Sequence, residues 1–117
     1  MDLEEQIDKH AEWNVKFRKA IVSEGTLNAE EILKDDACEM GKWIYGEART
    51  KFSHLPGYED LKKKHAEFHE AAGIIAKLIN EKKYAEAKEK MSLGTPFSDA
   101  AKNCSTAILL FKNETEK

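Results

Sequence analysis

Three of the four histidines in this 117-residue chain lie where helical spacing would turn them inward. His65 and His69 are four residues apart, and side chains at this spacing project from the same face of an α-helix, close enough to bind one metal ion. His10 falls within an apolar stripe of its own segment. Because burying neutral imidazoles without partners costs free energy, three inward histidines indicate a shared task such as metal binding. His54 lies in a Leu-Pro-Gly turn and is expected at the surface.

The two cysteines occur in different settings. Cys104 lies at the centre of the apolar stripe of residues 100–111, which predicts a small buried side chain. Cys38 lies away from the centre of its segment's stripe, so packing gives it no evident purpose, and a site outside the main core is one answer. Two cysteines allow one disulfide at most. The acidic, polar first residues do not resemble a signal peptide, so we expect a cytoplasmic location with free or metal-bound thiols.

Four amphipathic helices are expected to carry these residues. Two prolines and six glycines are few interruptions for this length, and apolar residues recur at helical spacing. The expected helices cover residues 2–24, 28 to just before His54, 58–82 and 84–113. Gly94-Thr95-Pro96 interrupts the last of them and predicts a kink or a break with a restart. The pattern favours an all-α, antiparallel four-helix bundle that forms a single domain over residues 1–117.

Composition and charge exclude several classes of protein. The chain is 41% hydrophobic and 35% charged, a balance that supports a folded core rather than a disordered tail. Its net charge of −3 argues against a broadly basic surface for nucleic acid. No apolar run approaches the roughly 20 residues of a membrane span. We therefore expect neither a nucleic acid nor a membrane as a partner.

Three short motifs follow one another along the chain. They read His10-Ala11-Glu12-Trp13, Cys38-Glu39-Met40-Gly41-Lys42-Trp43 and His65-Ala66-Glu67-Phe68-His69. A Leu55-Pro56 turn followed by Tyr58 stands before the third motif. Each motif alone is a weak signal, but together, in this order, they resemble the chemoreceptor zinc-binding (CZB) domain family. The resemblance covers roughly residues 8–111.

The resemblance implies a zinc site with three histidine ligands and one cysteine ligand, which would be His10, Cys38, His65 and His69. Zn²⁺ suits nitrogen and sulfur donors in a tetrahedral shell, and four protein ligands leave no open position for an activated water, so we do not expect an enzyme. The resemblance also implies a homodimer and a sensory role. Zinc availability, or oxidation of Cys38 by oxidants such as hypochlorous acid, would be signalled to an adjacent chemotaxis receptor or diguanylate cyclase domain.

Two alternatives stand beside this interpretation. A non-haem iron bundle of the hemerythrin or ferritin-like type would use carboxylates, typically in inward-facing Glu-x-x-His pairs. The residues three positions before the inward histidines are instead Ile7, Lys62 and Ala66. A thiolate ligand also favours zinc over a di-iron centre. The second alternative is a structural bundle in which the histidines are buried core residues with no metal.

Overall fold

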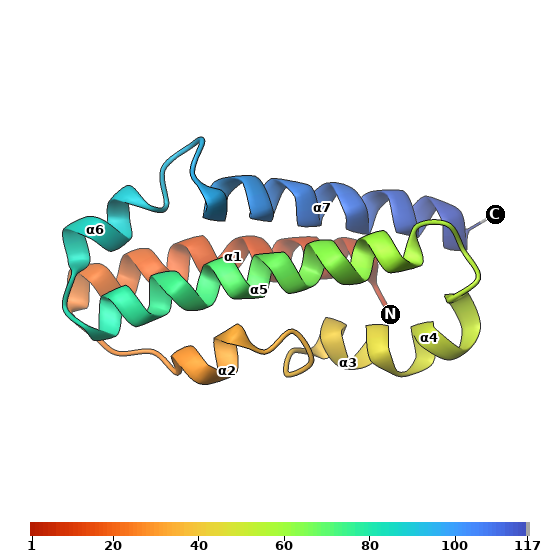
Figure 1. Cartoon of the computed structure of the whole chain (residues 1–117), viewed down its shortest axis with the longest axis horizontal. Helices are drawn as coiled ribbons and strands as arrows, with labels where there is room; N and C mark the ends of the chain where they lie inside the picture. The colour runs from red at the N-terminus through yellow and green to blue at the C-terminus, as the bar shows by residue number, and fades with distance from the viewer. Residues whose placement is uncertain (117) are drawn as a thin grey trace.

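Two long helices form the frame that carries the three inward histidines. The computed structural model describes residues 1–116, and Figure 1 shows α1 (Leu3–Ser23) and α5 (Tyr58–Asn80) along its length. The Asp2 carboxylate caps α1 by accepting the N–H of Glu5 at 3.1 Å. Glu24 ends the helix in the left-handed conformation, with φ 56°. The predictions of helices over residues 2–24 and 58–82 are confirmed.

The segment between these helices is interrupted, and the prediction of one continuous helix from residue 28 to just before His54 is wrong. It forms α2 (Ala29–Leu33), α3 (Glu39–Tyr45) and α4 (Glu47–Phe52). The backbone turns extended at Lys34, with ψ 121°. Two aspartates follow, and aspartate side chains compete with helix by bonding to nearby backbone. Gly46, with φ −106° and ψ −103°, separates α3 from α4.

A glycine allows the loop before α3 to fold back over that helix. A Cβ atom on Gly41 would lie 1.8 Å from the carbonyl oxygen of Asp35. That distance is far inside van der Waals contact, and the obstacle is backbone rather than a flexible side chain. Residues 34–38, named here the Cys38 loop, therefore keep their path only because residue 41 has no side chain.

The last part of the chain is also divided, as the sequence predicts. The helices are α6 (Tyr84–Glu89) and α7 (Pro96–Thr115), with Gly94 between them at φ 85°. The Thr95 hydroxyl caps α7 by accepting the N–H of Ser98 at 3.4 Å. Pro96 occupies the first helical position, where no N–H is needed. The break near Gly94–Pro96 is confirmed.

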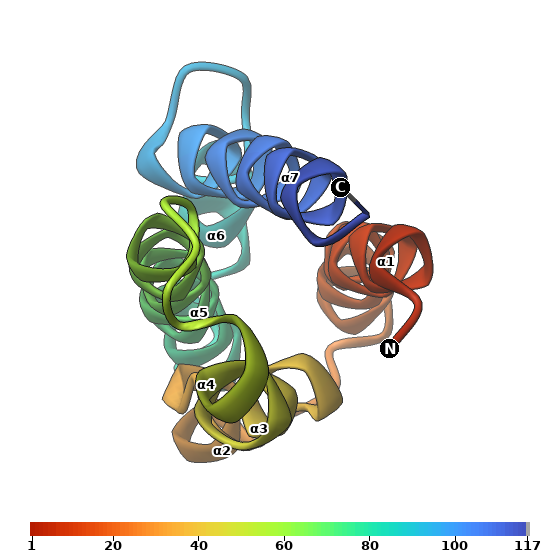
Figure 2. The ribbon, with the colours of Figure 1, turned by 90° about the vertical axis from the view of Figure 1, so that its right-hand side faces the viewer.

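The chain runs up and down along a long axis of 45 Å. Helices α1 and α5 run in one direction, and the α2–α4 segment and α7 run in the other (Figure 1). Seen end-on, these parts surround a common interior (Figure 2). The all-α class is confirmed, since residues 1–116 contain helices and no strand. The count of four is not confirmed: the same residues form seven helices, because two of the expected helices are divided. No helix in this range is long and apolar enough to cross a membrane.

Aromatic side chains fill the interior beside the histidines. Phe97 packs against Phe17 at 5.7 Å and against Phe68 at 5.8 Å between ring centroids. Phe68 is also 5.3 Å from the ring of His10. All three phenylalanines are almost fully buried. The inward histidines thus lie at the edge of an apolar core that α1, α5 and α7 share.

Candidate metal centre

Four donor atoms from three parts of the chain meet at one point. His10 comes from α1, His65 and His69 come from α5, and Cys38 is the N-cap residue of α3. One ligand atom of each lies within 4.8 Å of all the others. The structure therefore brings together the four residues that the sequence predicts as ligands. It corrects one detail, because Cys38 stands at a helix break and not within a continuous helix.

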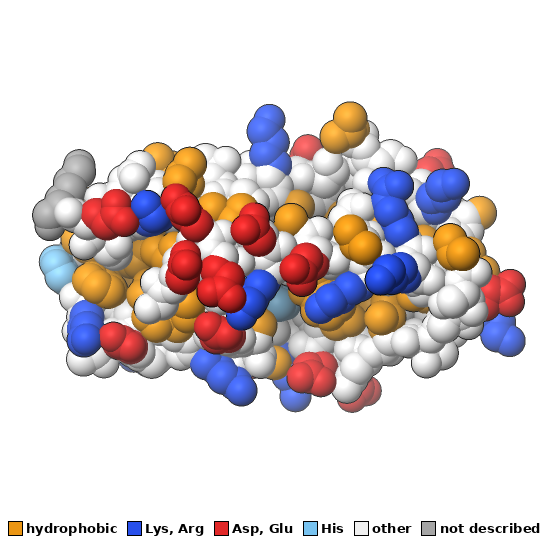
Figure 3. Space-filling view, turned by 180° about the vertical axis from the view of Figure 1, so that it is seen from behind, with side chains coloured by type: hydrophobic (Ala, Val, Ile, Leu, Met, Phe, Trp, Pro, Cys, Tyr) orange, Lys and Arg blue, Asp and Glu red, His pale blue; other side chains and the backbone are white. Residues whose placement is uncertain are grey.

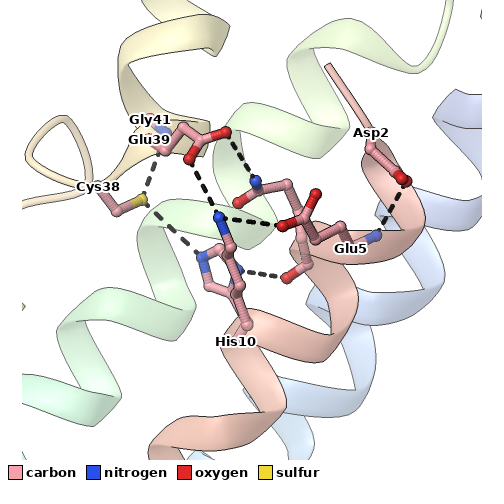
Figure 4. Close-up of polar contacts among 8 residues, drawn as sticks. Asp2, Glu5, His10, Cys38, Glu39 and Gly41 are labelled. Carbon is pink, nitrogen blue, oxygen red and sulfur yellow. Dashed lines mark hydrogen bonds and ion pairs between the residues drawn. The ribbon is translucent and has the colours of Figure 1, made fainter.

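The distances within this cluster are short. The Nε2 atom of His65 lies 3.2 Å from that of His10 and 3.1 Å from that of His69. The Sγ atom of Cys38 lies 3.3 Å from His65 Nε2, 3.4 Å from His69 Nε2 and 3.9 Å from His10 Nε2. Figure 4 shows Cys38 and His10 pointing toward one another across the gap between α3 and α1. Three ring nitrogens and one sulfur thus face a shared centre.

Backbone carbonyls fix the tautomers of two of the histidines. His10 Nδ1–H donates to the carbonyl oxygen of Gln6 at 2.8 Å, and His69 Nδ1–H donates to that of Ile32 at 2.8 Å. Because a carbonyl only accepts, the proton of each neutral ring is on Nδ1. Each Nε2 therefore directs a lone pair at the centre of the cluster. Metal-binding histidines are commonly oriented in this way, with one ring nitrogen facing the metal and the N–H of the other nitrogen bonded to a carbonyl or carboxylate.

His65 is the deepest member of the cluster. Its side chain is 0% exposed, and its Nδ1 atom is the buried side-chain nitrogen or oxygen without a hydrogen-bond partner among residues 1–116. Burial, reinforced by the neighbouring histidines, lowers the pKa of His65 to about 2. Burial also lowers the pKa of His10 and His69. All three rings are therefore held neutral, which is the form that binds metal.

Local backbone geometry places the Cys38 sulfur. Cys38 is extended, with ψ 163°, and its Sγ accepts the N–H of Gly41 at 3.3 Å in the manner of a helix N-cap. Burial raises the pKa of the Cys38 thiol, although the N–H groups of Gly41 and Met40 act in the opposite direction. A cation at the centre of the cluster would reverse this balance and hold the thiolate.

Side chains beside the cluster join α1 to the start of α3, and the sequence analysis did not identify them. Gln6 is 2% exposed, and its Nε2 donates to Glu39 Oε1 at 3.3 Å. Lys9 Nζ donates to Glu39 Oε2 at 3.1 Å. Gln6 also supplies the carbonyl that orients His10. Its position four residues before His10, on the same buried face, is a signal that could have identified it.

The observed distances fit a tetrahedral zinc ion. Zinc–nitrogen bonds of about 2.0–2.1 Å and zinc–sulfur bonds of about 2.3 Å imply separations of about 3.3 Å between nitrogens and about 3.6 Å between nitrogen and sulfur. The Nε2 atom of His65 lies 3.1 and 3.2 Å from those of His69 and His10, and the three nitrogens lie 3.3–3.9 Å from the sulfur. The four-residue group contains no carboxylate. Its donor chemistry suits zinc better than a di-iron centre.

The other cysteine and the other histidine lie outside this cluster. His54 is exposed in the turn before α5. Cys104 is 1% exposed within α7, and burial raises its pKa to about 12. The predictions of a surface histidine and a buried apolar cysteine are both confirmed. The two residues provide matched internal controls for the cluster.

Comparison with known proteins adds one finding. A family model described as the chemoreceptor zinc-binding domain matches residues 10–76, which is more than half of the chain and includes the four clustered residues. No curated protein and no solved structure matches the chain significantly.

Proposed function

The chain belongs to the chemoreceptor zinc-binding domain family, and from this premise we propose that His10, Cys38, His65 and His69 bind one Zn²⁺ in a sensory domain. The observation that supports this most directly is the convergence of the cluster. Two Nε2 lone pairs are aimed at the centre by carbonyls, and a sulfur stands within 3.3–3.9 Å of all three nitrogens. Without a cation, such lone pairs repel one another, and with one they are satisfied.

The proposed role is regulatory rather than catalytic. Bound zinc would supply a closed, four-coordinate centre that holds Cys38 as its thiolate, with no open position for a substrate. The chain itself would respond by movement of the Cys38 loop, because this loop is the one ligand-bearing part that is not a long helix. Loss of a ligand would free the loop from α1 and α5 and change the shape that a neighbouring domain meets.

Two inputs could produce that change: a fall in available zinc, or oxidation of Cys38. Cys38 is half-buried and Cys104 is buried, so an oxidant meets the sulfur of the cluster first. With limiting hypochlorous acid, mass spectrometry should find Cys38 modified before Cys104. Prior modification of Cys104 would contradict the redox input while leaving the zinc input standing. We place both inputs in a reducing cytoplasm, with a receptor or diguanylate cyclase domain as output.

A homodimer is also part of the proposal, and the outer face of α1 supports it. Its exposed positions recur at intervals of four and three residues: Glu4, Asp8, Ala11, Val15, Arg18 and Val22. Acidic side chains gather toward one end of the molecule on this side and basic ones toward the other (Figure 3). Two α1 helices packed antiparallel would set Asp8 against Arg18 of a second copy and bring the two Val15 regions together.

Light scattering of the V15E variant tests this surface. Val15 is 53% exposed on α1, and Ile74, at 48% on α5, provides a matched control at I74E. V15E should shift the mass toward that of the monomer, and I74E should not. Equal masses for wild type and V15E would place any dimer interface elsewhere.

Metal analysis of the chain purified without added metal tests the central proposal. About one zinc per chain is expected, and H65A should lose it while H54A keeps it. Two irons per chain would support the di-iron alternative instead. A metal-free chain that binds no zinc on titration would leave only the structural bundle.

A further inference from the structure

A cavity of about 320 Å³ opens onto the sulfur of the cluster. Cys38 and His69 line this cavity. Its other walls are formed by Trp13 of α1, by Leu27 and Ile32, and by Ala37 of the Cys38 loop. Cys38 is half-buried rather than buried, which agrees with such an opening. The cavity therefore connects solvent with the donor atom that differs chemically from the other three.

A second cavity reaches the cluster from the other side of α1 but does not touch the sulfur. Its volume is about 330 Å³, and it is lined by His10 and by residues of the α6–α7 region, among them Phe97 and Ala101. Of these two cavities, the first includes Cys38 and the second does not. The two cavities thus provide a direct structural contrast between a route to sulfur and a route to nitrogen.

The chemistry of the first cavity favours uncharged molecules. Trp13, Leu27, Ile32 and Ala37 make its walls largely apolar, and such walls do not replace the water around an ion. Glu31 stands at its rim, exposed, with its carboxylate accepting a bond from Asn28 at 3.2 Å. A fixed negative charge at the mouth repels anions and lowers their local concentration.

The wall residue Leu27 is held by its own backbone. Its N–H donates to Asn80 Oδ1 and its carbonyl accepts from Asn80 Nδ2, both at 2.8 Å. These two bonds fasten the loop before α2 to the end of α5, while the Leu27 side chain stays half-buried beside the cavity. The side chain can therefore be enlarged or shortened without loss of the bonds that place residue 27.

We propose that this cavity is the access route to Cys38 and that it admits small uncharged reagents in preference to anions. The inference rests on the proposed function, since it gives the cluster a class of reactant. Neutral oxidants would reach the sulfur, whereas their anionic forms and bulky charged thiol reagents would be held at the Glu31 rim. Leu27 and Trp13 then set the width of the route, and the cavity beside His10 plays no part in it.

Two thiol reagents of equal reaction type test the route on the zinc-loaded chain. Methyl methanethiosulfonate is uncharged, and its sulfonatoethyl analogue is an anion. In both reactions the cysteine thiolate attacks the alkylthio sulfur of the reagent, a new S–S bond forms, the S–SO₂ bond breaks and methanesulfinate leaves. On the zinc-loaded chain, Cys38 would also give up its bond to zinc. Zinc per chain is measured on each sample first, and mass spectrometry locates the modified cysteine. The rates on the urea-unfolded chain give the intrinsic ratio of the two reagents.

The expected outcome has three parts. The folded chain should prefer the neutral reagent by about tenfold more than the unfolded chain does. L27W should slow modification of Cys38 by about tenfold and L27A should speed it, while A101L, which fills the cavity beside His10, should leave the rate unchanged. E31Q keeps the contact to Asn28 but removes the charge, and it should selectively raise the rate of the anionic reagent.

Other outcomes would overturn the route. If both Leu27 variants react like the wild type, or if A101L slows the reaction as much as L27W, reagents reach Cys38 another way. If the ratio of the neutral to the anionic rate were the same in the folded chain as in the unfolded chain, selection by charge would be refuted. In each case a normal zinc content would leave the proposed function intact, whereas absence of zinc from the wild type would refute that function independently of the rates. The two failures are therefore distinguishable.

Discussion

Helix α5 and the interrupted segment α2–α4 both contribute to the cluster, and they do so by opposite means. Helix α5 is one continuous helix of 23 residues that presents His65 and His69 at a fixed separation of one turn. The α2–α4 segment contains three helices of 5, 7 and 6 residues in chain order and places Cys38 in the loop between the first two. The nitrogen donors of α5 are held by regular structure, whereas the sulfur is held by a few specific contacts.

This difference separates binding from response. A centre built only on long helices would hold its metal rigidly and transmit little. A sulfur on a loop can leave its position without unfolding the core, because the loop depends on Gly41 and on the tie between Tyr45 and Asp35 rather than on buried apolar area. Under the proposed function, the histidine side of the cluster would provide affinity for zinc, and the Cys38 side would provide the movable part.

The largest expected effect comes from removing a donor on α5. H65A should lower zinc affinity by more than about 100-fold, beyond the 10–100-fold range that follows from loss of supporting contacts. Competition with a chromophoric chelator measures the change. H54A is the matched control, because His54 is exposed and outside the cluster. Equal losses in the two variants would contradict the assignment of ligands and remove the contrast between the two regions.

Gly41 tests the other side of the comparison without touching a donor. In G41A the new Cβ would meet the Asp35 carbonyl at 1.8 Å, so the Cys38 loop must move away and take the sulfur with it. We expect zinc affinity to fall by about 10–100-fold, with a loss of about 1–3 kcal/mol in the free energy of unfolding of the metal-free chain.

The control for Gly41 is G25A. Gly25 follows α1, far from the cluster, and a Cβ there meets only the flexible Ser23 hydroxyl at 3.3 Å. Zinc affinity in G25A should equal that of the wild type. If G41A also bound zinc like the wild type, the loop would not be what positions Cys38, and the two regions would not differ as argued.

Acid should destabilise the metal-free chain through its histidines. Burial lowers the pKa of His10, His65 and His69 below the ordinary histidine value of about 6.5. Below about pH 6.5 the unfolded chain binds protons that the folded chain refuses, so the free energy of unfolding falls as pH falls. The slope reaches about 1.4 kcal/mol per pH unit for each histidine. Urea unfolding of the stripped chain between about pH 7.5 and pH 5 measures it.

The same titration distinguishes the two regions, because the groups that take up protons on unfolding lie on α1 and α5 and not in the Cys38 loop. Burial raises the pKa of Cys38, so its thiol is already protonated at neutral pH in the metal-free chain and contributes no acid slope. H65F should flatten the curve, and C38S should leave it unchanged. A midpoint independent of pH in the wild type would show that the histidines are not held neutral.

The sequence predicts the long helices α1 and α5 well, but it does not predict the course of the Cys38 loop. The apolar stripes around His10, His65 and His69 carry the 3.6-residue period, which is why α1, α5 and the inward turn of three donors were predicted. The course of residues 34–38 has no such period. The path of this loop depends on the Asp35 carbonyl lying over Gly41. The two residue types allow this contact, but nothing in their spacing predicts it. The hydrogen bond between Gln6 and Glu39 also joins two distant parts of the chain, so the local pattern of the sequence does not predict it.

The smallest expected effect concerns the contacts of Glu39, which join the start of α3 to α1. Glu39 follows Cys38 directly and accepts bonds from Gln6 and Lys9 of α1. E39Q keeps the size of the side chain but removes its charge, and the pair with Lys9 is exposed, so zinc affinity should change by about twofold or less, and less still at high salt. E59Q, in an exposed pair with Lys62 on α5 itself, is the control with no effect. A tenfold loss in E39Q would mean that charge, and not the backbone of the Cys38 loop, places the sulfur.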